Sequence, residues 1–254
     1  MDSPPAHDLA ACGLCSELRE LRDSHFMPAA LYPKNKKKAL ATRTETILDP
    51  DQIQERFLCE ECEQRFNRNG ESEVLRWIAP KAKTGASPLQ EALRKTPAWT
   101  HPSDDLTCHL SASLGISPEK FAYFALSLVW RAAAHAWPVQ DGSLTTPLDL
   151  ADFAEPVRQF LLGKASFPSH TLIMLTVCSD ERSQEYWMPP TRSGEIEGLI
   201  VVPINGVLFR VWMGRVVPSR LHPQSIFFPS PDNPVFRTNC WDILSQGLST
   251  LFPT

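Results

Sequence analysis

The spacing of hydrophobic residues predicts one long helix near the middle of the chain. Residues 117–119, with the sequence Ser-Pro-Glu, have the features of a helix start: an N-cap serine, a proline at the first helical position and an acidic residue in the first turn. Apolar side chains follow at intervals of three and four residues, at Phe121, Phe124, Leu128 and Ala132. Apolar residues also fill the flanks, so we expect this helix to be buried on most sides.

The pattern then changes to one typical of strands. β-branched and aromatic residues are frequent in three segments, residues 170–178, 199–203 and 207–213. Asn205-Gly206, between the last two, is a strong signal for a tight hairpin. Residues 148–162 are expected to form one or two short helices, and residues 240–252 have a helical pattern. The second half is therefore predicted to be α+β with a small antiparallel sheet.

The first part of the chain gives shorter signals. Residues 16–23 are short and charged, and they favour a strand or a helical turn. Residues 51–69 have helical composition, with Cys62 expected near the start of a helix that runs through Phe66. Residues 71–78 predict a further helix.

Composition sets the class of protein and its division. The chain has 254 residues, of which 43% are hydrophobic and 21% charged, and this is enough to bury a core. Residues 81–104 are rich in proline, lysine, serine and threonine, so they predict a linker between a unit of residues 1–80 and an α+β unit of residues 105–254. The sequence has no long apolar run and no secretory pattern at its start, so we expect a cytoplasmic protein without membrane contact. A net charge of −4 argues against a protein that coats nucleic acid non-specifically.

Two C-x2-C pairs carry the clearest chemistry, Cys12 with Cys15 and Cys59 with Cys62. Two tight turns that each present two thiolates match the tetrahedral coordination of a structural zinc ion. The pairs are too closely spaced for internal disulfides, which favours a bound metal in a reducing compartment. The other cysteines form no second ligand set at a recognisable spacing and are interpreted as packing residues: Cys108, Cys178 and Cys240.

The order of these motifs resembles the HNH, or ββα-metal (His-Me finger), nuclease superfamily in its zinc-stabilised treble-clef form. A first C-x2-C pair precedes Asp23-Ser24-His25, and the second pair opens a helix. The resemblance covers residues 12–78. It implies a structural zinc beneath a hairpin and a helix, and a metal-dependent endonuclease that hydrolyses DNA phosphodiester bonds. Bacterial proteins of this type serve in defence against phage or mobile DNA, so the resemblance suggests that role.

The family's catalytic arrangement can be carried over by position. Its general base falls on His25, and a histidine can accept a proton near neutral pH. The position after the last zinc cysteine holds Glu63, a carboxylate suited to Mg²⁺ or Mn²⁺. The position before the base is usually a metal-binding Asp or His, and here it holds Ser24, whose neutral hydroxyl is a poor ligand. The candidates to replace it are Asp23, Glu71 and Glu73.

The remaining candidate residues do not identify the substrate or the partner. A compact basic run is interpreted either as a loop that contacts phosphates or as a solvated loop. It consists of Lys34, Lys36, Lys37 and Lys38. Arg131 and His135, four residues apart on the expected helix, could contact a phosphate or find partners inside the protein. DNA is the expected substrate, and the sequence does not distinguish it from RNA. The alternatives are a catalytically inactive, zinc-stabilised module that binds nucleic acid or protein, and a subunit that binds a protein partner through residues 105–254.

Overall fold

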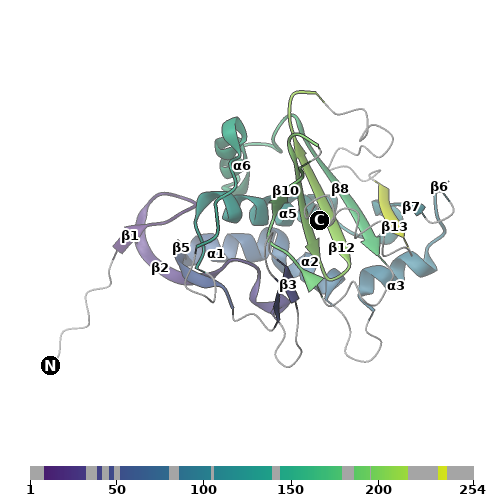
Figure 1. Cartoon of the computed structure of the whole chain (residues 1–254), viewed down its shortest axis with the longest axis horizontal. Helices are drawn as coiled ribbons and strands as arrows, with labels where there is room; N and C mark the ends of the chain where they lie inside the picture. Colours follow the sequence, from purple (N-terminus) through teal and green to yellow (C-terminus); the bar gives the residue numbers. More distant parts are fainter. Residues whose placement is uncertain are drawn as a thin grey trace.

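The structure is a computed structural model of the chain, and it combines helices with largely antiparallel sheets (Figure 1). This confirms the predicted α+β class. No helix in the described part of the chain is long and apolar enough to cross a membrane. The structure describes residues 9–32, 39–41, 46–48, 52–79, 86–103, 106–138, 144–178, 186–194, 196–216 and 234–238.

A three-stranded antiparallel sheet forms the N-terminal module at the left of Figure 1. Its strands are β1 (Leu9–Ala11), β2 (Leu18–His25) and β5 (Gln54–Cys59), in the order β1-β2-β5, and α1 (Glu60–Phe66) follows β5 directly. The helix expected to start near Cys62 and to run through Phe66 is α1, which confirms that prediction. The helical composition of the preceding segment was misleading, because that segment forms β5. The hydrogen-bond partners that β2 offers along this segment outweigh its local propensity.

The helical backbone continues beyond α1 without a break. A π-helical segment, η2 (Asn67–Glu71), joins α1 to α2 (Ser72–Ile78). Gly70 in η2 is buried against α5 (Pro118–Ala134), because a Cβ at this position would lie 2.9 Å from the backbone nitrogen of Phe124. A π-helical turn inside an α-helix is rare and frequently marks a functional site.

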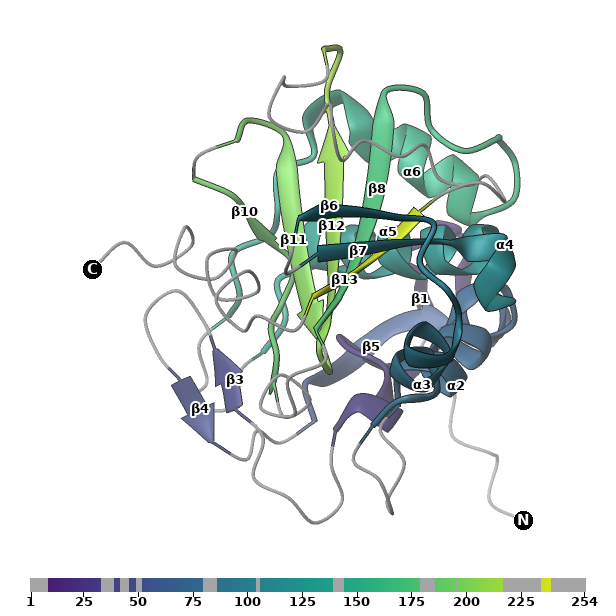
Figure 2. The same cartoon turned by 90° about the vertical axis from the view of Figure 1, so that its right-hand side faces the viewer.

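Helix α5 lies between the N-terminal module and the large sheet (Figures 1 and 2). It begins as predicted, with Pro118 at its first position and the Ser117 hydroxyl accepting a hydrogen bond from the Lys120 backbone N–H, 3.3 Å away. One side contacts α1, η2 and α2. On the other side the Phe124 ring lies 5.7 Å from the ring of Phe209 in the sheet. α5 therefore connects the two parts of the hydrophobic core.

The large sheet has ten strands in the order β4-β3-β9-β11-β12-β8-β13-β7-β6, with β10 paired to β11 (Figure 2). The pairs β3–β9 and β8–β13 are parallel, and the others are antiparallel. The strands are β3 (Ala39–Ala41), β4 (Thr46–Leu48), β6 (Thr100–Ser103), β7 (Leu106–Leu110), β8 (Thr171–Cys178), β9 (Tyr186–Trp187), β10 (Thr191–Arg192), β11 (Leu199–Ile204), β12 (Val207–Met213) and β13 (Pro234–Thr238).

The centre of this sheet agrees with the sequence. β8, β11 and β12 occupy the three segments that were predicted as strands. Asn205 and Gly206 have φ values of 48° and 77°, as a tight hairpin turn requires. The sheet is larger than expected, because strands from outside the predicted second unit, β3 and β4, join its edge.

The remaining helices are short: η1 (Ala29–Leu31), α3 (Pro88–Lys95), α4 (Ser111–Leu114), η3 (Ala151–Phe153) and α6 (Ala154–Leu161). α3 lies within the predicted linker, and its buried Leu89 and Leu93 belong to the same hydrophobic cluster as α5 and the sheet. The division of the chain into two units stays a prediction. The predicted C-terminal helix, residues 240–252, lies outside the described residues.

Candidate metal centre and adjoining cavity

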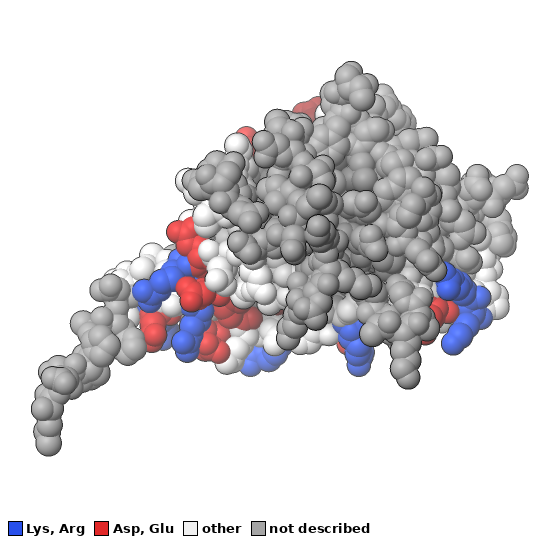
Figure 3. Space-filling view, turned by 60° about the horizontal axis from the view of Figure 1, so that its bottom comes forward, with Lys and Arg blue, Asp and Glu red and all other residues white. Residues whose placement is uncertain are grey.

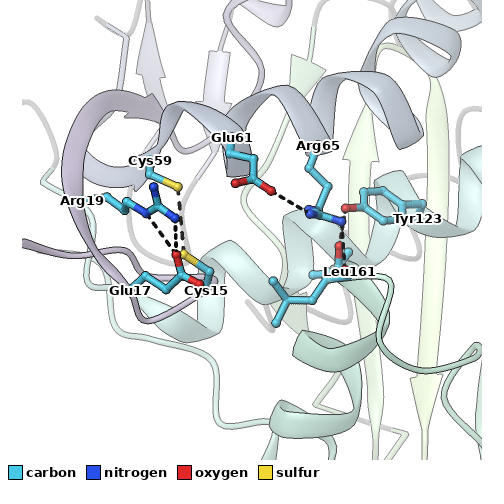
Figure 4. A network of polar contacts seen from close by, with 9 residues as sticks. Cys15, Glu17, Arg19, Cys59, Glu61, Arg65, Tyr123 and Leu161 are labelled. Atoms are coloured by element: carbon cyan, nitrogen blue, oxygen red, sulfur yellow. Dashed lines mark hydrogen bonds and ion pairs between the residues drawn. The ribbon is translucent and has the colours of Figure 1, made fainter.

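The four paired cysteines gather in one cluster. The sulfur atoms of Cys12, Cys15, Cys59 and Cys62 all lie within 4.8 Å of one another. Figure 4 shows the sulfur atoms of Cys15 and Cys59 directed toward each other, 4.0 Å apart. Four thiolates around a tetrahedral zinc ion would be separated by about 3.8 Å, given Zn–S bonds of about 2.3 Å. The cluster therefore fits a metal ion such as zinc.

The secondary structure around the cysteines explains their convergence. Cys12 lies in the turn between β1 and β2, Cys59 ends β5, and Cys62 lies in the first turn of α1. Gly13 in the turn packs under the ring of Phe57, and a Cβ there would lie 2.2 Å from a ring carbon. Gly13 is thus required by this contact, which the sequence pattern did not reveal.

Hydrogen bonds inside the cluster favour a thiolate. The backbone N–H of Cys59 donates to the Cys12 sulfur at 3.3 Å. The pKa of the Cys12 thiol falls to about 4, chiefly because the Cys62 thiol donates a hydrogen bond to it, and backbone N–H groups add to the effect. The same hydrogen bond, together with burial, raises the pKa of Cys62. Because metal ligation requires deprotonated cysteines, an acidic thiol at this point prepares the cluster for an ion.

Helix α6 supports the first cysteine pair from outside. Arg158 donates from Nη1 to the backbone oxygen of Leu14, 2.8 Å away. Its Nε and Nη2 atoms donate to the carboxylate of Glu155 at 2.7 and 2.8 Å. The guanidinium therefore joins α6 to the turn that presents Cys12 and Cys15.

A cavity of about 320 Å³ lies beside this module. It is bounded by the end of β2, the η1 turn, the helical segment from α1 to η2, and α5. Both residues predicted as catalytic, His25 and Glu63, line it. Its polar lining consists of His25, Glu60, Glu63, Gln64, Asn67, Glu71 and Arg131.

His25 is held in one tautomer by a neighbouring amide. Its Nε2 atom lies 2.6 Å from Oε1 of Gln52. An amide oxygen can only accept a hydrogen bond, so Nε2 donates to it, and in the neutral imidazole Nδ1 carries the lone pair. The side chain is half-buried at the end of β2. Nδ1 is therefore the atom through which His25 can accept a proton.

The helical segment supplies the acidic wall. Glu60, Glu63, Asn67 and Glu71 follow at three- and four-residue intervals and share one side of the helix. Oε1 of Glu63 is buried without a hydrogen-bond partner. Oε1 of Glu71 lies 2.7 Å from Nη2 of Arg131. Sequence reasoning missed Glu60, Gln64 and Asn67. Helical spacing counted from Glu63 would have found Glu60 three residues before it and Asn67 four residues after it, and Gln64 lies four residues after Glu60.

The other proposed ligands lie elsewhere. The hydroxyl of Ser24 is buried within the sheet, where it accepts a hydrogen bond from the Leu58 N–H at 2.9 Å, next to the β-bulge between Arg22 and Asp23. Asp23 is exposed and does not line the cavity. Glu73 pairs with Arg76 on the surface of α2. Of the three candidate replacements, only Glu71 reaches the cavity.

The charged surface gives less information. On the face in Figure 3, basic and acidic side chains are intermixed over the described residues. His135 pairs with Glu55 at 2.9 Å and does not line the cavity. The basic run Lys34, Lys36, Lys37 and Lys38 lies outside the described residues, so its role stays a prediction.

No family model, no curated protein and no solved structure matches this chain. The resemblance to HNH nucleases therefore stays a prediction from the sequence motifs. Among the described residues, the four cysteines are the one group of ligand atoms that gathers closely enough to surround a metal ion.

Proposed function

We propose that the chain is a metal-dependent, HNH-like endonuclease that hydrolyses DNA phosphodiester bonds. The single observation that carries this proposal is the cavity that His25 and Glu63 line together, with Glu63 directly after the zinc-type ligand Cys62. A role in defence against phage or mobile DNA belongs to the same proposal and follows from the family resemblance alone.

His25 is the proposed general base. Gln52 holds its Nε2–H, so the lone pair of Nδ1 is free to take a proton from a water molecule. That water would attack the phosphorus atom of a phosphodiester in the cavity. The cysteine cluster would serve as structural zinc site and would fix α1 against the hairpin of β2 and β5.

Two carboxylates in the cavity support the proposal of a catalytic divalent ion of the Mg²⁺ or Mn²⁺ type. Such ions are bound by one or two carboxylates and complete their shell with water and substrate phosphates. The buried, unpartnered Oε1 of Glu63 is an oxygen ligand of this kind, and Glu71 is a second carboxylate in the same cavity. When bound, such an ion polarises the phosphate and stabilises the leaving oxygen.

Cleavage of supercoiled plasmid with added Mg²⁺ or Mn²⁺ tests the proposal. The parent chain should produce nicked or linear DNA, and His25→Ala and Glu63→Ala should each slow this by about 100-fold or more. Glu61→Ala is the matched control, because Glu61 lies in the same helix but pairs with Arg65 away from the cavity. Zinc content and melting temperature should match in all four proteins.

Two results would contradict the proposal. Unchanged cleavage by His25→Ala would exclude His25 as the base. A parent that retains DNA in a gel shift but cleaves it with neither metal would favour the inactive binding module. An RNA of the same sequence, run in parallel, shows whether cleavage is restricted to DNA.

A further inference from the structure

Arg131 is a buried cation with unused hydrogen-bond donors at the cavity wall. Its side chain is 2% exposed, and its guanidinium carbon lies 4.7 Å from the centre of the Phe66 ring. Nη2 contacts Oε1 of Glu71 at 2.7 Å. Nε and Nη1 are buried and have no hydrogen-bond partner. A guanidinium nitrogen has no acceptor capacity, so these two groups can only donate to an acceptor.

A role as the counter-ion of Glu71 does not account for this geometry. A guanidinium that serves only a carboxylate usually forms two parallel hydrogen bonds with it. Here one nitrogen contacts one carboxylate oxygen, and the other two nitrogens are left without acceptors. Buried donors without partners are destabilising and rare, and an explanation is a ligand that brings the acceptors.

The chemistry of the cavity selects the ligand. A free guanidinium donor favours an anionic acceptor, and phosphoryl oxygens are acceptors that arginine binds well. We propose that Arg131 is a phosphate-binding residue of this cavity, with its unpartnered Nη1 donating to an oxygen of a phosphoryl group. The assignment of that group to a nucleic acid rests on the proposed function. Glu71 competes with the phosphate for the same guanidinium.

This inference gives opposite predictions for the two members of the pair. Phosphate binding is measured by NMR titration of the full chain with inorganic phosphate, which has no ester bond that the chain could cleave. Arg131→Gln should raise the Kd about tenfold or more, because charge-assisted hydrogen bonds are lost. Glu71→Gln should lower the Kd, because the competing negative charge is removed. Arg76→Gln is the control, since Arg76 pairs with Glu73 outside the cavity.

Opposite changes in the phosphate Kd of the two variants distinguish phosphate binding from a structural role of Arg131. If Arg131 were only a counter-ion, both substitutions would lower the melting temperature and both would leave the Kd within twofold of the parent, which would overturn the inference. If Arg131→Gln does not fold, Glu71→Gln decides by itself. Tighter phosphate binding in that variant supports the inference, and unchanged or weaker binding overturns it.

The source of the phosphoryl group is distinguished with short DNA strands. Arg131-dependent binding of a strand without terminal phosphates identifies an internal phosphodiester. Dependence seen only with a 5′-phosphorylated strand identifies a chain end, and dependence with neither overturns the assignment to DNA.

The inference and the proposed function can fail separately. If the parent does not cut plasmid but binds phosphate through Arg131, the proposed nuclease activity is wrong and the inference about Arg131 stands. If the parent cuts plasmid and the phosphate Kd is unchanged in both Arg131→Gln and Glu71→Gln, the inference about Arg131 is wrong and the proposed nuclease activity stands.

Discussion

Replacing Gly70 with alanine tests the contact that fixes α5, and with it Arg131, against the cavity. A Cβ at position 70 would lie 2.9 Å from the backbone nitrogen of Phe124 and 3.1 Å from its Cα. Two effects oppose each other. Alanine is favoured over glycine inside a helix by about 1 kcal/mol. Overpacking costs about 1–3 kcal/mol, and here it reaches the upper part of that range because backbone atoms cannot move aside by changing rotamer. We expect a net loss of about 1–2 kcal/mol in the free energy of unfolding.

Urea unfolding, followed by tryptophan fluorescence, measures this loss as a lower midpoint at an unchanged slope. Arg68→Ala is the matched control, because Arg68 lies in the same π-helical segment with its side chain exposed. Its effect should stay within about 0.5 kcal/mol. The phosphate Kd should also rise in Gly70→Ala, since α5 would move relative to η2. A Gly70→Ala protein as stable as the parent would refute the reasoning, because the gain in helix propensity would then exceed the steric cost.

Three further predictions concern the metal cluster, the sheet and the pH dependence. Elemental mass spectrometry of the purified chain should find one zinc ion per molecule. Cys15→Ser should lose both the ion and the cooperative unfolding transition. A parent whose melting temperature does not change when its metal is removed would contradict this. Ser24→Ala should lower stability by about 1–3 kcal/mol, because it leaves the buried Leu58 N–H without an acceptor, and should leave the cleavage rate unchanged below the melting temperature; a changed metal requirement would instead assign Ser24 to the cavity. Arg158 and Gln159 lower the pKa of Glu155 from 4.5 to about 2, so the carboxylate stabilises the fold above about pH 4.5 and loses this effect as the pH falls toward 2. The difference in melting temperature between the parent and Glu155→Gln should therefore shrink between pH 5 and pH 2, and a constant difference would count against this ion pair.

Local patterns in the sequence were sufficient for the elements that depend on near neighbours. The start of α5 is determined by its N-cap serine and first-turn proline, and the β11–β12 turn by Asn205 and Gly206. Both signals act within a few residues. The cysteine cluster was also predictable, because the spacing of each pair fixes a turn that presents two sulfur atoms to one side.

Elements that depend on distant partners were not predictable in this way. Residues 54–59 have helical composition, yet they form β5 because β2 pairs with them. The hydroxyl of Ser24 accepts the Leu58 N–H beside the β-bulge, so a position read as part of a metal shell belongs to the sheet. Strands β3 and β4 join the large sheet through a pairing with β9 that no local pattern records.

The residues of the candidate site show the same difference between local motifs and distant partners. His25 and Glu63 were found because the family motif gives each of them a position relative to the cysteine pairs. Gln52, which sets the tautomer of His25, and Arg131, which contacts Glu71, come from other segments, and only the folded chain brings them to the cavity.

The packing of α5 shows why the site cannot be attributed to the N-terminal module alone. The Phe57 ring, which covers the cysteine turn at Gly13, stacks on Trp130 of α5 at 5.6 Å. Phe66, beneath the Arg131 guanidinium, contacts the same tryptophan at 6.1 Å. Without α5 both rings would lose the tryptophan against which they pack, and the cavity would lose its buried cation. The second half of the chain therefore contributes both a wall of the site and the apolar surface on which the cysteine module packs, whatever else it recognises.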